Sequence, residues 1–244
     1  MLLEELRREV ALTARRLPTE RLVVGTSGNV SAWDPHSGHL AITPSGVPYE
    51  ELQADDIVLL DLEGNQIEGR WLPSSEHRMH RYVYQRDPRQ RAVVHTHSLF
   101  ATAFSACGRE IPAIHYAIAN IGTSIRVAPY ATYGTHELAQ GALDTMGDDS
   151  AVLLQNHGVL AVGTSLAKAF GVAQTVEFLA ELYLRTLQIG APIVVADDEI
   201  ARVREKFRTY GQPIATRNTP TSIPARRRAT ARSAKPRGGG VTEV

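Results

Sequence analysis

Apolar residues recur along this chain with two different periods, and each period predicts a different kind of element. Between residues 2 and 17 they fall every three or four positions among charged residues, which is typical of an amphipathic helix that Pro18 would end. A longer pattern of the same kind runs from Leu166 to Gln188 and predicts the main helix of the fold. Further helices are expected over residues 73–85, 98–106, 136–146 and 198–206.

Short apolar runs bounded by glycine, proline or asparagine predict strands. The expected strands cover residues 30–33, 40–43, 57–61, 67–69, 92–97, 125–127, 151–154 and 159–162. The third and fourth of these flank Gly64-Asn65 and predict a hairpin, and the last two bracket Asn156-His157-Gly158. Because strands and helices mix without a regular repeat, the fold class is an α/β or α+β layered domain. The chain has neither a Rossmann nor a Walker glycine pattern.

Charge divides the chain into two unlike segments. Residues 217–244 hold seven basic residues and one Glu, a net charge of +6, and the overall balance of 26 basic and 26 acidic residues leaves residues 1–216 at −6. The last segment is rich in Pro, Ser, Thr, Ala and Gly, which is typical of disorder. We expect one domain over residues 1–212 and a basic, disordered tail over residues 213–244. A basic run can bind nucleic acid, but a solvated tail without a specific function is favoured.

Cysteine usage and hydropathy restrict where the protein works. Cys107 is the only cysteine, so no disulfide can form within the chain. No apolar run is long enough to span a bilayer, and the charges between residues 4 and 9 exclude the apolar part of a signal peptide there. The cytoplasm is the expected location, without a membrane partner.

The most informative motif is His95-Thr96-His97, which follows the apolar run of residues 92–94. Side chains alternate between the two faces of a strand, so His95 and His97 are expected to point to the same face. Glu76 and His157 each lie beside a predicted element and would complete a set of three imidazoles and one carboxylate. Zinc prefers ligands of this kind, and a divalent metal site is the leading interpretation.

Not every histidine in the sequence indicates chemistry. A single His-x-His pair on a strand is weak evidence by itself, and the chain has nine histidines. His77 and His80 are three residues apart and could share a helix face, which would mimic a second site. We expect these two to be surface or interface residues.

Three small polar turns predict an anion site, namely Gly28-Asn29, Ser45-Gly46 and Ser74-Ser75. Backbone N–H groups in such turns, serine hydroxyls and a helix N-terminus together can hold a phosphate. Each turn alone is better explained as an ordinary turn or cap. Because Ser74-Ser75 directly precedes Glu76, the three turns next to a metal site favour a bound phosphate.

A divalent metal beside a phosphate suits chemistry on a phosphorylated hydroxyketone, because the metal polarises the carbonyl and stabilises the enediolate. Glu76 could be a fourth metal ligand at rest and a base when substrate displaces it. The reaction also needs an acid for the alkoxide or aldehyde oxygen. Tyr116, Tyr133 and Tyr210 are candidates, and the residue pattern does not choose among them.

Eight strings of the sequence match a known family in register. They lie at residues 25–31, 42–46, 72–76, 93–97, 111–116, 128–135, 155–158 and 206–211. Together they resemble the class II aldolase/adducin family over roughly residues 1–212. Singly most of the strings are weak, but together they are highly specific.

The resemblance implies a three-layer α/β/α fold around a central, mostly antiparallel sheet, in a fourfold-symmetric homotetramer with sites at the subunit interfaces. It implies Zn²⁺ held by Glu76, His95, His97 and His157, and a substrate phosphate bound by Gly28, Asn29, Ser45, Gly46, Ser74 and Ser75. Glu76 would be the acid/base residue. Tyr116 from a neighbouring subunit would donate a proton to the aldehyde oxygen, and Tyr210 would help to close the site. Tyr133 departs from the family pattern, where Phe is expected, and puts a polar tip near the aldehyde. Ser45 stands where the pattern has Thr.

The expected reaction is zinc-dependent retro-aldol cleavage of a ketose 1-phosphate, L-fuculose 1-phosphate first, to dihydroxyacetone phosphate and L-lactaldehyde. Two other reactions of the superfamily stay open, a sugar-phosphate 4-epimerase and a methylthioribulose-1-phosphate dehydratase. A non-enzymatic, adducin-like interaction domain is a further alternative, although a scaffold has no need for the metal ligands, the phosphate turns and Tyr116 together.

Overall fold

The computed structural model describes residues 1–210, and Met1–Thr209 form one compact unit. The predicted tail at residues 213–244 lies outside the described residues, so the domain boundary at residue 212 stays a prediction. Within the described part, no helix is long and apolar enough to cross a membrane.

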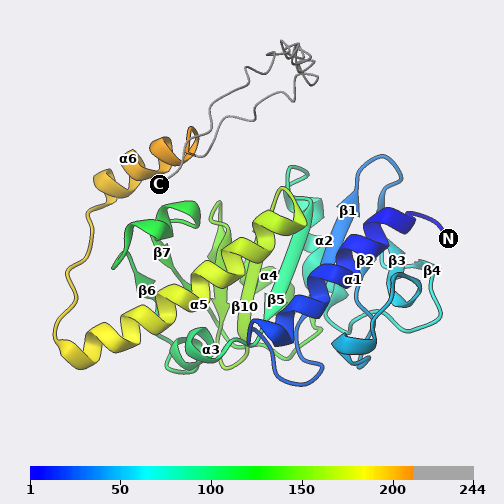
Figure 1. Ribbon diagram of the computed structural model, residues 1–244, viewed down its shortest axis with the longest axis horizontal. Helices are drawn as coiled ribbons and strands as arrows, with labels where there is room; N and C mark the ends of the chain where they lie inside the picture. Colours follow the sequence, from blue (N-terminus) through cyan, green and yellow to red (C-terminus); the bar gives the residue numbers. More distant parts are fainter. Residues whose placement is uncertain (211–244) are drawn as a thin grey trace, which may run out of the picture. The chain divides into compact units, whose positions relative to one another are not determined.

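An eight-stranded sheet forms the centre of the unit, with the strand order β4-β3-β2-β1-β5-β10-β9-β8 (Figure 1). All neighbouring strands are antiparallel except β8 and β9, which are parallel. The strands are β1 Asn29–Asp34, β2 His39–Ile42, β3 Val58–Asp61, β4 Gln66–Glu68, β5 Ala92–Thr96, β8 Val127–Ala128, β9 Ala151–Leu154 and β10 Gly158–Gly163. A separate two-stranded sheet pairs β6 (Ile111–Pro112) with β7 (Ser124–Ile125).

Helices cover both faces of the large sheet, which confirms the predicted α/β class and the mostly antiparallel centre. The helices are α1 Glu4–Thr19, α2 His77–Arg86, α3 Leu99–Ala106, α4 His136–Met146, α5 Leu166–Ile189 and α6 Asp197–Phe207. Helices α1, α3 and α5 pack on one face, while α2 and α4 lie on the other (Figure 1). Three short 3-10 turns, at Tyr49–Glu51, Ala54–Asp56 and Tyr116–Asn120, lie in the connections.

Alternation along the central strands explains why both faces of the sheet are covered. In β5, Val94 packs into the core beneath α1 and α5, whereas Val93 packs into the core beneath α2 and α4. In β10, Val159 belongs to the first core and Leu160 to the second. Because successive side chains point to opposite faces, a strand with both faces buried needs an unbroken apolar run.

The first helix does not end at Pro18, as the sequence pattern predicted. Helix α1 runs to Thr19 and includes Pro18 in its last turn. The turn survives because the Glu20 N–H still donates to the Arg16 carbonyl oxygen at 2.9 Å, and the Arg16 guanidinium also contacts the Glu20 carboxylate. These two contacts between Arg16 and Glu20 keep the last helical turn intact beyond Pro18.

The strand predicted at residues 125–127 is divided between two sheets. Ile125 belongs to β7 and Val127 to β8, with Arg126 between them. The Arg126 guanidinium donates to the Met146 carbonyl oxygen at 2.6 Å and to Asp149 Oδ2 at 2.7 Å. Arg126 is therefore fixed to the turn after α4 at the point where the chain passes from one sheet to the other.

Candidate functional site

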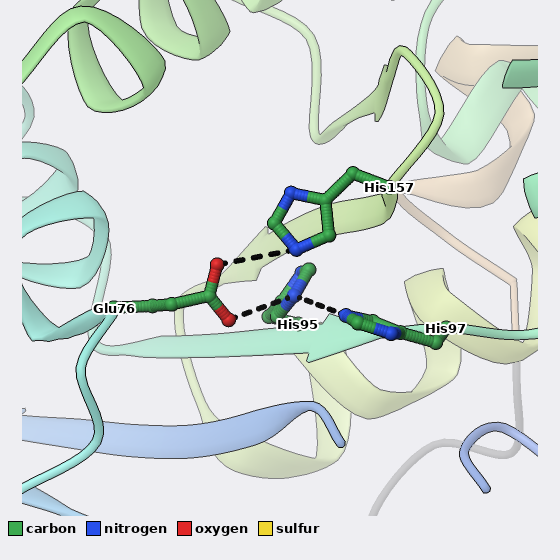
Figure 2. A group of neighbouring side chains, drawn as sticks. All are labelled: Glu76, His95, His97 and His157. Atoms are coloured by element: carbon green, nitrogen blue, oxygen red, sulfur yellow. Dashed lines mark hydrogen bonds and ion pairs between the residues drawn. The ribbon is translucent and has the colours of Figure 1, made fainter. Parts of the chain in front are cut away.

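Four side chains that are distant in the sequence meet at the end of β5 (Figure 2). His95 lies in β5 and His97 directly follows it, while Glu76 is the N-cap residue of α2. His157 lies in the turn between β9 and β10. Because β10 pairs with β5, with Val159 opposite Thr96, this turn is placed beside the end of β5.

The donor atoms of these side chains are close enough to share one cation. His95 Nε2 lies 3.1 Å from Glu76 Oε2, and His157 Nε2 lies 3.2 Å from Glu76 Oε1. The Nε2 atoms of His95 and His97 are 2.9 Å apart. One donor atom from each of the four residues lies within 4.8 Å of the other three, so the group could hold a metal ion.

The hydrogen bonds around this cluster also fit a cation. His95 is fully buried, and its Nδ1 lies 2.8 Å from the Val159 carbonyl oxygen. A carbonyl oxygen only accepts, so Nδ1 carries the proton and the Nε2 lone pair of a neutral ring faces the cluster. Glu76 Oε1 is buried without a hydrogen bond, apart from its ion-pair contact with His157. Three imidazoles and one carboxylate are a donor set that suits a divalent metal.

The electrostatics of the cluster favour an ionised Glu76 and a neutral His97, two of the protonation states that metal binding requires. Burial alone would raise the pKa of Glu76, but the facing His95 and His157 side chains hold that pKa well below its ordinary value. Burial, with His95 and His157 nearby, lowers the pKa of His97 to about 3. Burial works against protonation of His95, but the Glu76 carboxylate outweighs it and raises the pKa of that ring. At neutral pH Glu76 is therefore an anion and His97 a neutral ligand.

A cavity of about 300 Å³ opens onto the cluster. It brings the three turns singled out in the sequence, with Gly28, Asn29, Ser45, Gly46, Ser74 and Ser75, together with Glu76, His97 and His157. The sequence pattern did not indicate four further polar residues that line the cavity, Thr26, Ser27, Tyr130 and Asn156. Asn156 could have been found from the sequence, because Asn and Gly close together between two strand patterns indicate a tight turn. In the structure Asn156 adopts a positive φ of 53°, a conformation in which Asn is enriched.

Backbone contacts hold two of these turns against each other. The Ser45 N–H donates to the Leu72 carbonyl oxygen, and the Ser74 N–H donates to the Thr43 carbonyl oxygen, each at 3.0 Å. Pro44 and Pro73 form an isolated bridge between the same segments. The two serine-containing turns therefore border the cavity as one unit.

The third turn needs glycine for two reasons. Gly28 has a φ of +77°, which L side chains rarely adopt, and a Cβ there would lie 2.7 Å from the His95 carbonyl oxygen. The Tyr49 hydroxyl donates to the carbonyl oxygens of Ser27 and Gly28 at 3.0 and 2.8 Å. The turn is thus held directly against the strand that carries the histidines.

The three candidate tyrosines have different places. Tyr133 lines the cavity, together with Tyr130. Tyr116 begins the 3-10 turn after β6, does not line the cavity and is 53% exposed, with its ring 4.5 Å from that of His115. Tyr210 is the last described residue and lies outside the compact unit, so its role in closing the site stays a prediction.

His80 corrects the expectation that it is a surface or interface residue. The side chain is fully buried, whereas His77 on the same helix is half-buried. His80 Nε2 lies 2.5 Å from Asn29 Oδ1, and Asn29 Nδ2 donates to Glu76 Oε2 at 3.0 Å. The i to i+3 spacing of His77 and His80 was compatible with an exposed pair, but only His80 turns toward the sheet.

Comparison with known proteins gives a consistent result. Residues 8–184 match the family model described as the class II aldolase and adducin N-terminal domain. An L-fuculose phosphate aldolase of Escherichia coli K12 is 46% identical over 209 residues, which cover 85% of this chain and 96% of that protein. A 5-deoxy-D-ribulose 1-phosphate aldolase of Bacillus thuringiensis serovar kurstaki is 42% identical over 212 residues, covering 87% of this chain and 100% of that one.

The solved structures agree with the sequences. An L-fuculose 1-phosphate aldolase superposes with a TM-score of 0.82 at 41% identity and covers 84% of this chain and 96% of its own. The chain belongs to the class II aldolase and adducin family and is a class II, metal-dependent aldolase, a carbon–carbon lyase.

Proposed function

We propose that this aldolase catalyses the reversible, zinc-dependent cleavage of a ketose 1-phosphate, L-fuculose 1-phosphate first, to dihydroxyacetone phosphate and L-lactaldehyde. One observation carries the proposal: the three polar turns line a single cavity together with Glu76, His97 and His157, three of the four members of the cluster. The relatives support a phosphorylated ketose, because their names specify L-fuculose phosphate and 5-deoxy-D-ribulose 1-phosphate.

The phosphate of the substrate would bind at the three turns. Asn29, Ser45 and Ser74 offer side-chain donors there, and Gly28, Gly46 and Ser75 offer backbone N–H groups. The serine turn at residues 74–75 directly precedes the N-terminus of α2, where the helix dipole favours an anion. Binding the phosphate at these turns would place the adjacent hydroxyketone next to Glu76 and the histidines.

Zn²⁺ is proposed as the metal, held by Glu76, His95, His97 and His157. When bound, it would supply Lewis-acid stabilisation of the enediolate that carbon–carbon cleavage generates. The histidines fit this role because His95 presents its Nε2 lone pair and His97 is neutral at pH 7. The three histidines would hold the metal when substrate takes the place of Glu76, so that the Glu76 carboxylate would be available to exchange protons.

Glu76 would move the proton at the substrate carbon. In the synthetic direction its carboxylate removes a proton from the carbon of dihydroxyacetone phosphate that becomes nucleophilic, and in cleavage it returns that proton. Its depressed pKa keeps it ionised at neutral pH, the form that can accept a proton. Asn29 donates to one of its oxygens at 3.0 Å and so restricts its orientation.

Tyr116 would donate the proton to the aldehyde oxygen from a neighbouring subunit. The side chain does not line the cavity of its own chain, and its ring is held by contacts with His115 and Phe207, at centroid distances of 4.5 and 6.1 Å. An exposed, oriented phenol outside its own cavity is what a site shared between subunits requires. The resemblance to the family implies a fourfold-symmetric homotetramer, and this assembly is part of the proposal.

The aldehyde side of the cavity would set the choice among ketoses. Tyr133 and Tyr130 line it and are 65% and 63% exposed, so their side chains border open space. Breaking the bond between carbons 3 and 4 releases a three-carbon aldehyde from L-fuculose 1-phosphate and a two-carbon aldehyde from a 5-deoxypentulose 1-phosphate. The second class is the nearest competing substrate, because a relative with 42% identity is named for it.

The decisive experiment combines metal analysis with a substrate panel. Purified protein is assayed for zinc content, and dihydroxyacetone phosphate release is followed enzymatically with L-fuculose 1-phosphate, 5-deoxyribulose 1-phosphate and 5-methylthioribulose 1-phosphate. We expect one zinc per chain, the highest kcat/KM for L-fuculose 1-phosphate and loss of activity after chelation. A higher value for a 5-deoxypentulose would replace the proposed substrate. Consumption of every ketose without dihydroxyacetone phosphate release would overturn the proposed reaction.

A further inference from the structure

A chain of hydrogen-bonded side chains leads from the interior of the sheet to the candidate metal cluster. The Tyr84 hydroxyl and Ser31 Oγ are 2.6 Å apart, and Ser31 Oγ lies 2.7 Å from His80 Nδ1. His80 Nε2 lies 2.5 Å from Asn29 Oδ1, and Asn29 Nδ2 donates to Glu76 Oε2 at 3.0 Å. Every member of the chain is buried, and Ser31 and His80 are fully so.

The direction of each bond in this chain follows from chemistry. The ionised Glu76 oxygen only accepts, so the Asn29 carboxamide must present its NH₂ to it. A flipped amide would place Oδ1 3.0 Å from the carboxylate, two acceptors facing each other. With NH₂ toward Glu76, Oδ1 must accept from His80, so His80 carries its proton on Nε2.

His80 is fixed in that form by its surroundings. Burial is the main reason that its pKa is lowered to about 3, and the neighbouring His95 adds to the effect. In a neutral ring that carries its proton on Nε2, Nδ1 is a hydrogen-bond acceptor. Nδ1 of His80 therefore accepts a hydrogen bond from the Ser31 hydroxyl, and Ser31 Oγ in turn accepts one from the Tyr84 hydroxyl. All the hydrogen bonds of this network therefore point the same way, with each group donating to the next one toward Glu76.

We propose that His80 is a positioning residue for the metal site: it holds the Asn29 carboxamide in the one orientation that donates to Glu76 and so aims the Glu76 carboxylate at the three histidines. The inference rests on the proposed metal-dependent function. His80 would contact neither metal nor substrate, but would set the metal affinity through two hydrogen bonds, from His80 to Asn29 and from Asn29 to Glu76. Mutation of a residue that orients a metal ligand through hydrogen bonds typically lowers metal affinity by about 10- to 100-fold.

The test measures metal affinity directly, by competition with a chelator on metal-free protein. His80→Leu removes the Nε2–H, and we expect its zinc affinity to fall about 10- to 100-fold. His80→Gln keeps a side-chain N–H for Asn29 and should recover most of the loss. His77→Gln is the matched control, because His77 lies on the same helix but its ring contacts Arg81 and not Asn29 or Glu76, so the change should leave zinc affinity unchanged. Unfolding curves for each variant show whether the fold is kept.

A second measurement uses the wild-type protein and is independent of substitution. Nitrogen-15 NMR of the histidine rings at pH 7 should show His80 as the neutral tautomer with its proton on Nε2. A proton on Nδ1, or a charged ring, would overturn the proposal even if His80→Leu did not fold. Unchanged zinc affinity in folded His80→Leu would overturn it too. Wild-type protein that takes up no metal would instead refute the proposed function, so the two failures are distinguishable.

Discussion

At the scale of single residues, His95 and His97 differ although they belong to one motif. His95 is fully buried within β5 and bonded to the Val159 carbonyl oxygen, so it is part of the interior as well as of the cluster. His97 follows the end of the strand and lines the cavity. Replacing His97 therefore tests the site with the least disturbance of the sheet.

The substitution His97→Ala is expected to remove most of the bound zinc and to abolish cleavage. The remaining His95, His157 and Glu76 offer three donors instead of four, and the neutral imidazole lost is one that needs no deprotonation. Zinc per chain is measured by elemental analysis after dialysis against a weak chelator, and the unfolding midpoint of the metal-free form is compared with wild type. Full zinc occupancy in the variant would contradict the assigned ligand set.

The sequence indicated the members of the candidate metal cluster because they carry local signals. His95 and His97 alternate on an apolar strand, and His157 lies between two strand patterns. The role of His80 had no such signal, because a histidine on a polar-looking helix becomes buried only when that helix packs on the sheet. The partner of Asn29 was hidden for the same reason, since 51 residues separate it from His80.

At the scale of elements, α1 is attached to the sheet edge by a buried charge. Arg7 is 2% exposed, its Nη1 lies 2.5 Å from Glu68 Oε1 in β4, and its Nη2 donates to the Ile57 carbonyl oxygen at 2.7 Å. The adjacent Arg8 is half exposed and pairs only with Glu4 and Glu5 on its own helix. Arg7 is therefore buried and bonded to other elements, whereas the adjacent Arg8 is exposed and bonded only within α1.

We expect Arg7→Leu to lower the free energy of unfolding by about 1–3 kcal/mol, because it leaves the buried Ile57 carbonyl oxygen without the donor that Arg7 supplies. Arg8→Leu should change it by less than about 1 kcal/mol, since exposed ion pairs contribute little. Urea unfolding of the metal-free protein, at one fixed protein concentration, measures both. Similar effects of the two variants would show that burial of Arg7 is not what fastens α1.

Local patterning predicted most elements, and its errors have local causes as well. The sequence pattern predicts a helix over residues 136–146, and α4 has these bounds, with Thr135 Oγ1 accepting from the Leu138 N–H at 3.2 Å as its N-terminal cap. Pro18 was taken as a helix end, but the bonds between Arg16 and Glu20 continue the turn beyond it. The strand at residues 125–127 was placed as one element because nothing local shows that Ile125 and Val127 pair with different partners.

At the scale of the whole molecule, the order of the strands decides where the site forms, and patterning alone does not give it. β5 lies between β1 and β10, although 58 residues separate the Asn29 of β1 from the Asp87 that follows α2. Nonlocal pairing of this kind depends on how the whole sheet packs. The layered, mostly antiparallel fold came instead from the resemblance of eight motifs to one family, and the comparisons confirm it.

If Tyr116 serves the site of a neighbouring subunit, two inactive variants should restore activity when they assemble together. Tyr116→Phe alone should lower kcat about 10²- to 10⁴-fold while zinc content stays normal. When Tyr116→Phe and His97→Ala are co-expressed one to one, the mixed tetramers should have about a quarter of wild-type activity. In a cyclic tetramer about one site in four then combines an intact cluster from one subunit with an intact Tyr116 from its neighbour. Activity is measured after the mixed assemblies are separated by two affinity tags.

A matched control for this experiment is the mixture of His97→Ala with His95→Ala. Both changes damage the same half of the site, so no arrangement of subunits rebuilds it. If the Tyr116→Phe mixture gains no more than this control, the tyrosine acts within its own chain or has no role in proton transfer.

The sheet order also governs when the protein can first acquire its metal. Glu76, His95 and His97 leave the ribosome well before His157, which arrives with β10 and completes the cluster only when that strand docks beside β5. Until then a nascent chain offers an incomplete set of ligands and holds a metal weakly. A metal ion that needs all four donors would therefore bind only after β10 has docked beside β5.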